Sequence, residues 1–175
     1  EAGRLEAPAW SPRPRISLPL ALELWHDLGG RPQACRDAGL RYLALARETG
    51  STRLEVGALG NLADDEFALG RVDEALALCR QAIALAAAIQ RPAAALHAYS
   101  NMVPALLARG ALQAVEDAIR EGRPLMVRTW GHATDLLVAA ALLAWERGQA
   151  PLSASLLGCA DQGYAARGNV PDPPE

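Results

Sequence analysis

The stretch from Ala68 to Pro92, ALGRVDEALALCRQAIALAAAIQRP, places a Gly-Arg pair between two apolar runs. After the pair, small and apolar residues recur at the spacing of one helical face, from Ala75 and Leu76 to Ala86. Gly70 is typical of the position just past a helix, where the left-handed backbone carries no steric cost for glycine. Pro92 suits the first position of a further helix. The stretch therefore predicts two helices joined by a Gly-centred turn, with a third helix starting at Pro92.

The same pattern repeats along the chain. Gly30, Gly70, Gly110 and Gly148 are separated by 40, 40 and 38 residues, and an asparagine lies nine residues before both Gly70 and Gly110. Internal periods of this size indicate stacked supersecondary units, because a single helical hairpin cannot bury both of its apolar faces. We therefore predict an all-α fold, a right-handed α-solenoid of four antiparallel helical hairpins with a period of about 40 residues.

Local signals set the expected boundaries. Residues 16–168 are expected to form the helical-repeat domain, between a Pro-rich tail or linker at 1–15 and a second tail at 169–175. Thr52 and Glu55 match the S/T-x-x-E pattern, which predicts a capping box at the start of the second hairpin.

Composition excludes several classes of function. The net charge is −3 and all 17 basic residues are arginine, which provides no basic face for nucleic acid. The three cysteines, Cys35, Cys79 and Cys159, show no ligand spacing and lie in apolar runs, so we interpret them as packing residues in a reduced environment. No basic segment precedes an apolar segment in the manner of a signal peptide, and the longest apolar run, Leu136 to Trp145, is about half the length of a membrane span. The expected location is cytoplasmic, without membrane contact.

The sequence also resembles a known family of repeats. Residues 70–76, GRVDEAL, followed by Ala82 and Ile83, resemble the turn and second helix of a tetratricopeptide repeat, although Glu66 and Cys79 stand where that family prefers bulky side chains. Residues 154–161, ASLLGCAD, resemble the closing hairpin of the arrays at the C-terminal end of bacterial signal-transduction ATPases and transcriptional regulators. The resemblance implies a recognition module of a bacterial regulator whose other domains lie outside this chain.

The resemblance further implies which side chains face a concave groove. Counting back from the turn glycines by the register of tetratricopeptide repeats selects candidate groove residues for a protein, peptide or small-effector partner: Gly57, Gly60, Asp64, Phe67, His97, Ser100, Leu107, Asp135 and Trp145. Mid-helix glycines such as Gly57 and Gly60 allow close approach either by a ligand or by an adjacent helix. The acidic run at 64–66 is interpreted as a solvated helical face, with cation binding as the alternative.

Motifs of catalysis and of cofactor binding are missing from the sequence. It contains no P-loop, no G-x-S-x-G elbow and no His pair at metal-binding spacing, so we expect no cofactor, no metal site and no enzymatic activity. The leading hypothesis is a non-catalytic module that recognises a partner in the groove. The alternative is a scaffold that self-associates, for example as a homodimer, through an exposed terminal hairpin at Leu152, Leu156 and Leu157. An enzyme whose site is assembled from distant residues is the third hypothesis.

Overall fold

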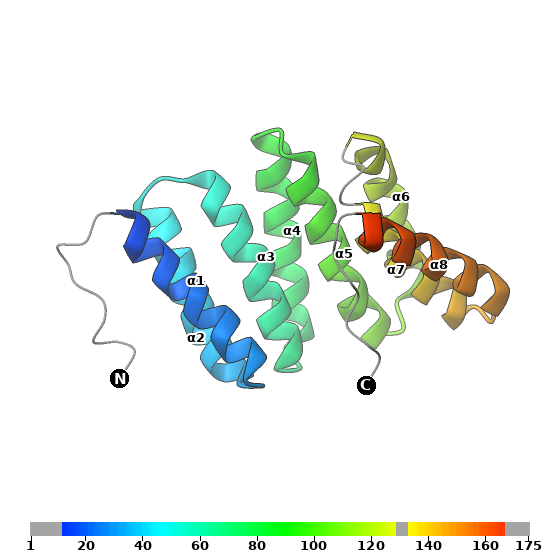
Figure 1. Cartoon of the computed structure of the whole chain (residues 1–175), viewed down its shortest axis with the longest axis horizontal. Helices are drawn as coiled ribbons and strands as arrows, with labels where there is room; N and C mark the ends of the chain where they lie inside the picture. Colours follow the sequence, from blue (N-terminus) through cyan, green and yellow to red (C-terminus); the bar gives the residue numbers. More distant parts are fainter. Residues whose placement is uncertain (1–11, 129–132, 167–175) are drawn as a thin grey trace. The chain divides into compact units, whose positions relative to one another are not determined.

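A computed structural model describes residues 12–128 and 133–166, and these residues are helical apart from short turns (Figure 1). Eight helices lie within the described residues: α1 (Pro12–Leu28), α2 (Pro32–Glu48), α3 (Thr52–Ala68), α4 (Val72–Ala88), α5 (Pro92–Ala108), α6 (Leu112–Arg128), α7 (Ala133–Glu146) and α8 (Ala150–Ala166). The predicted all-α class is confirmed. None of the described helices combines the length and the apolar character required to cross a membrane.

The turns between helices follow the glycine pattern. Gly70 has a φ of 74°, its N–H donates to the Phe67 carbonyl oxygen at 2.8 Å, and the next N–H donates to the Glu66 carbonyl oxygen at 2.8 Å. The predicted left-handed residue after α3 is therefore confirmed. The turn between α4 and α5 differs, since Gln90 takes the same conformation with a φ of 54°. A side chain in this region is strained, because its Cβ lies close to the following carbonyl oxygen.

The chain divides into two units, residues 1–85 and 86–175. In the first unit, α1 packs on α2 and α2 packs on α3. In the second unit, α5, α6 and α7 contact one another, and α7 packs on α8. Small side chains such as Ala46 and Ala58 are fully buried, and so are leucines such as Leu59 in the first unit and Leu96 in the second. The cores are therefore built from close helix approach rather than from aromatic packing.

The structure differs from three local predictions, in whole or in part. The predicted capping box is wrong: Ser51 is the N-cap residue without a side-chain cap, and Glu55 instead accepts a hydrogen bond from Arg47 Nε at 2.7 Å. The packing interpretation fails for Cys159, which is exposed, and holds for the buried Cys35 and Cys79. Helix α1 begins at Pro12, inside the expected tail 1–15, while the rest of that tail and the tail 169–175 lie outside the described residues.

Candidate functional site

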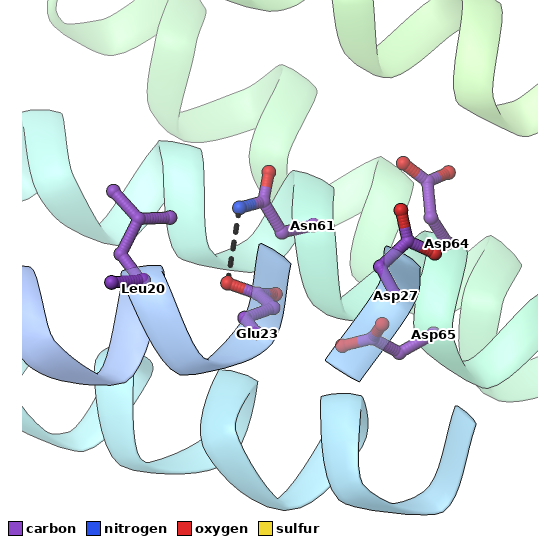
Figure 2. A pocket seen from close by; sticks show the side chains of 7 residues that line it. Leu20, Glu23, Asp27, Asn61, Asp64 and Asp65 are labelled. Carbon is purple, nitrogen blue, oxygen red and sulfur yellow. Dashed lines mark hydrogen bonds between the residues drawn. The ribbon is translucent and has the colours of Figure 1, made fainter. Parts of the chain in front are cut away.

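A cleft with mixed polar and apolar walls lies between α1 and α3 in the first unit. It has a cavity volume of about 570 Å³, which is within the range of small-molecule sites. Figure 2 shows residues of both helices directed into it, with Glu23 and Asn61 turned toward each other. The lining residues are Leu20, Ala21, Glu23, Asp27, Asn61, Asp64 and Asp65. Four of these seven side chains carry a carboxyl group, so the cleft is strongly acidic.

A second cavity of about 360 Å³ adjoins the cleft and shares Asp27, Asp64 and Asp65 with it. Among the described residues that line the two cavities, Arg31 is the one that is basic. Its guanidinium carbon lies 3.9 Å from the centre of the Trp25 ring, and its Nη2 donates to the Trp25 carbonyl oxygen at 3.4 Å. The positive charge of Arg31 is thus held against Trp25 by a cation–π contact.

Glu23 is a buried carboxyl on α1, with 6% of its surface exposed. Its Oε2 accepts a hydrogen bond from Asn61 Nδ2 at 3.2 Å, whereas its Oε1 is buried without a hydrogen-bond partner among the described residues. Desolvation raises the pKa of Glu23, because burial disfavours its charged form, and the bond from Asn61 offsets part of that rise.

Asp65 on α3 completes a carboxyl pair with Glu23. Its Oδ2 is likewise buried, and within the described residues no group other than the Glu23 carboxyl is available to it as a hydrogen-bond partner. Burial and the nearby negative charge of Glu23 raise the pKa of Asp65 to about 8, and a hydrogen bond to Glu23 adds to the rise. Two ionised carboxylates cannot donate to each other, but a protonated Asp65 donates to Glu23. Below about pH 8 the pair therefore holds one shared proton.

Gly39 on α2 forms the floor beneath this pair. A Cβ at Gly39 would lie 3.0 Å from Asp65 Oδ2 and 3.1 Å from Glu23 Oε1. Both oxygens without partners therefore lie beside the same backbone position, and the missing side chain of Gly39 leaves the space that they occupy. Three consecutive helices build the site: α1 and α3 supply the carboxyls, and α2 supplies the close backbone approach.

Asp64 is the candidate residue from the sequence that lines the cleft. Desolvation by the cleft walls, together with the charges of Glu23 and Asp27, raises its pKa to about 7. Its side chain is nevertheless open to water, which screens these charges. The Glu23–Asp65 pair is accordingly the stronger titratable feature of the cleft.

The other candidates in the first unit do not line the cleft. Gly60 is buried and Phe67 is half-buried. Gly57 is exposed, and a Cβ added there would lie 3.6 Å from Tyr42 Oη, an ordinary contact distance. Close packing against a neighbouring helix therefore does not account for Gly57.

The candidates in the second unit are separate side chains on α5, α7 and α8. His97 is exposed, with Asn101 Nδ2 at 3.4 Å from its Nε2. Ser100 Oγ donates to the Leu96 carbonyl oxygen at 3.2 Å, and Asp135 accepts a hydrogen bond from Tyr164 Oη at 2.8 Å. Leu107 and Leu156 are half-buried, whereas exposed apolar side chains are found at Trp145, Leu152 and Leu157.

The acidic run at 64–66 is not the solvated face that the sequence indicated. Asp64 is exposed, Asp65 is half-buried and Glu66 is only 4% exposed. Glu66 is paired with two arginines, with its Oε1 at 2.6 Å from Arg36 Nε and its Oε2 at 3.1 Å from Arg71 Nη1. The three carboxyls therefore have three different environments, and only the first two face the cleft.

Sequence reasoning missed most of the cleft, although part of it was within reach. The count back from the turn glycine was applied to three hairpins; applied to Gly30 as well, it selects Leu20 and Asp27, ten and three residues earlier. Both line the cleft. Glu23 and Asp65 do not fall on those positions, since their proximity follows from how α1 and α3 pack.

Comparison with known proteins yields a likeness of fold. No protein-family profile matches the chain, and no curated protein does. Among solved structures, the crystal structure of BtubC (BKLC) from P. vanneervenii is similar, with a TM-score of 0.71 and 14% sequence identity over 97% of this chain and 71% of BtubC. At this identity, the similarity supports a helical-repeat type of fold and nothing about activity.

One expectation is corrected by this comparison. The prediction that the chain is not an enzyme was wrong as a conclusion: the match to BtubC is one of fold and carries no argument against catalysis. Buried carboxyls with raised pKa values, such as Asp65, are also found in clefts that carry out proton transfer.

Proposed function

We propose that this chain is a recognition module, built on a helical-repeat array, that binds a peptide, a protein segment or a small effector in the α1–α3 cleft. The cleft itself is the observation that carries the proposal. A cavity of about 570 Å³ combines apolar Leu20 and Ala21 with converging polar groups from two helices. Such a mixture provides both burial of the ligand and selection among ligands.

The regular helix spacing supports the array. Helices α2 to α6 each span 17 residues, with three residues between them. We infer a right-handed solenoid of the tetratricopeptide type with a period of about 40 residues, in which α1 and α3 are the first helices of successive hairpins. In such an array the first helices line the concave side, and the cleft lies between two of these helices. A bacterial regulator that transmits occupancy of the cleft to further domains is the context we propose.

The test is to fill the cleft without disturbing the core. Ala21 is exposed and lines the cavity, so Ala21→Trp places an indole in it. Peptides selected from a random display library on the wild-type chain are expected to bind this variant at least about tenfold more weakly, since they lose their contact surface. Ala77→Trp, at an exposed position of α4 that does not line the cleft, is the matched control. Circular dichroism verifies the fold of both variants.

Affinity is measured by fluorescence anisotropy of the labelled peptides. If every selected peptide binds Ala21→Trp as tightly as it binds the wild type, the cleft is not the recognition site.

Self-association is a second candidate function, favoured by the apolar surface of α7 and α8. Leu142, Trp145, Leu152 and Leu157 are between 39% and 63% exposed. Light scattering across a concentration series is expected to show a dimer that Leu157→Glu abolishes, whereas Ala165→Glu, at an exposed position of α8, retains it. A monomeric mass at all concentrations rejects this candidate.

A further inference from the structure

Resting on the function proposed for the same cleft, we propose that the α1–α3 cleft selects a ligand with an ammonium or guanidinium group, which binds between Glu23 and Asp65. Two buried carboxyl oxygen atoms carry this proposal: within the described residues, no group outside the Glu23–Asp65 pair donates a hydrogen bond to either of them.

Glu23 Oε1 and Asp65 Oδ2 are these two atoms. Glu23 is more than nine-tenths buried and lines the cavity, so the orphaned oxygen belongs to a side chain that faces a ligand-sized space. Once the proton that the pair shares is lost, two buried acceptors without a donor and two like charges in close proximity remain, and both are costly. A donor that is also cationic removes both costs when it binds between the two carboxyls.

The charges around the pair are mostly negative. Asp27 from α1 and Asp64 from α3 both act on the Glu23–Asp65 pair, and both line the cavity. From α2, Cys35 and Tyr42 are neutral, because burial raises the pKa of each. On α4, Cys79 beside Asp64 is neutral too, with its pKa raised to about 12.

The basic groups nearby are already engaged. Arg31 is stacked on Trp25, and Arg36 is paired with Glu66. Among the described residues, no arginine donates to the orphaned oxygens. A cation that satisfies them therefore has to be supplied by a ligand.

The cleft fits an organic cation better than a metal ion. Within the described residues, no group of three or more His, Cys, Asp or Glu side chains has the arrangement that holds a metal. The cavity also contains Leu20 and Ala21 beside the carboxyls. An alkyl stem that ends in a charged head, as in a basic side chain or a free diamine, matches an apolar wall next to an acidic floor.

Binding is expected to exchange a proton for the cation. In the free chain the Glu23–Asp65 pair shares one proton below about pH 8. The cation is bound best when both carboxyls are ionised, so its binding releases that proton. Affinity then rises about tenfold per pH unit as the pH approaches 8 and levels off above it. A guanidinium ligand stays charged throughout this range, so the change in affinity reports the protein alone.

The experiment compares two peptides by isothermal titration calorimetry. One is Ac-Gly-Ala-Arg-Ala-Gly-NH2, and the other carries neutral citrulline in place of arginine. At pH 8 we expect the arginine peptide to bind at least about tenfold more tightly, because only its side chain is charged. At pH 6.5, two buffers with different ionisation enthalpies are expected to report release of close to one proton per peptide bound. Tighter binding of 1,4-diaminobutane than of the peptide would support the same cation site and identify a free amine as its source.

Two variants connect the effect to the carboxyl pair. Asp65→Asn and, independently, Glu23→Gln are expected to abolish both the preference for arginine and the proton release. Glu74→Gln removes one negative charge at an exposed position outside the cleft and is expected to change neither. Having two separate variants guards against a loss caused by misfolding of one of them.

Failure of this inference is distinguishable from failure of the proposed function. Equal affinity for the two peptides, absence of binding by the arginine peptide, or retention of the preference in Asp65→Asn and Glu23→Gln overturns the cation assignment. Binding of Ca²⁺ or Mn²⁺ in the cleft with exclusion of the arginine peptide overturns it too. In each case the proposed function still stands if library-selected peptides lose affinity for Ala21→Trp.

Discussion

Replacing Asp65 by asparagine should change how the stability of this chain depends on pH. In the folded chain the pKa of Asp65 is raised to about 8, from an ordinary value of 3.8 in the unfolded chain. Between these values the folded chain holds a proton that the unfolded chain has lost, so unfolding releases it. The stabilisation from this proton is complete below about pH 4 and is lost as the pH rises through about 8.

The magnitude follows from the linkage of proton binding to folding. One proton released on unfolding lowers the free energy of unfolding by about 1.4 kcal/mol per pH unit. Between pH 5.5 and 7.5 this amounts to at most about 3 kcal/mol, and water that reaches the half-buried Asp65 reduces it. For a chain of this size, each kcal/mol corresponds to a change of about 2–4 °C in Tm. Asp65→Asn needs no proton to donate to Glu23, so its stability should be close to that of the wild type below about pH 4 and should exceed it by a margin that grows as the pH rises to about 8.

Urea unfolding followed by circular dichroism at half-unit steps from pH 5 to 8.5 measures the effect. The control is Glu74→Gln, which removes the same charge at an exposed position and should keep the wild-type slope. The reasoning is refuted if Asp65→Asn and the wild type lose stability in parallel over this range, because the shared proton would then not exist.

Three further substitutions test the turns, the buried ion pairs and the helix packing. Gln90→Gly should raise the free energy of unfolding by about 0.5–1 kcal/mol in urea titrations, since the left-handed φ of 54° strains the glutamine; a loss of stability would contradict this. Glu66→Gln should lower it by about 2–4 kcal/mol, because the buried carboxylate is paired with two partly buried arginines; an unchanged thermal midpoint would show that the pairs contribute nothing. On α8, Gly158→Ala should stabilise the chain by about 0.5–1 kcal/mol, because its new Cβ meets no atom within 4 Å. Gly163→Ala on the same helix should destabilise the chain, because its Cβ would clash with the Thr134 methyl group. A calorimetric Tm of Gly163→Ala that equals or exceeds that of Gly158→Ala would contradict this contrast.

Helix boundaries were accessible from the sequence because they follow from local chemistry. Gly70 marks the end of α3, and Pro92 begins α5, since backbone conformation at each position depends on the residue itself. The same local reasoning failed at Thr52 and Glu55. The Glu55 carboxylate has a stronger partner in Arg47, a guanidinium from the preceding helix, than a backbone amide would be.

The cleft depends on packing between helices and could be predicted only in part. Asp64 was selected from its place in the repeat, and the same count from Gly30 reaches Asp27. Glu23 and Asn61 lie 38 residues apart and form a hydrogen bond because α1 and α3 both flank α2. No local pattern in the chain encodes that distance.

Composition, spacing and turn residues along the chain were therefore sufficient for an all-α protein with helices close to their observed positions, because helix formation and termination are short-range events. The environment of each carboxyl was settled by the folded arrangement instead. Asp64, Asp65 and Glu66 are consecutive and chemically alike, yet the first faces water in the cleft, the second shares a proton with Glu23, and the third pairs with two arginines. Burial and neighbouring charge control the behaviour of a carboxyl, and both arise only when the helices pack.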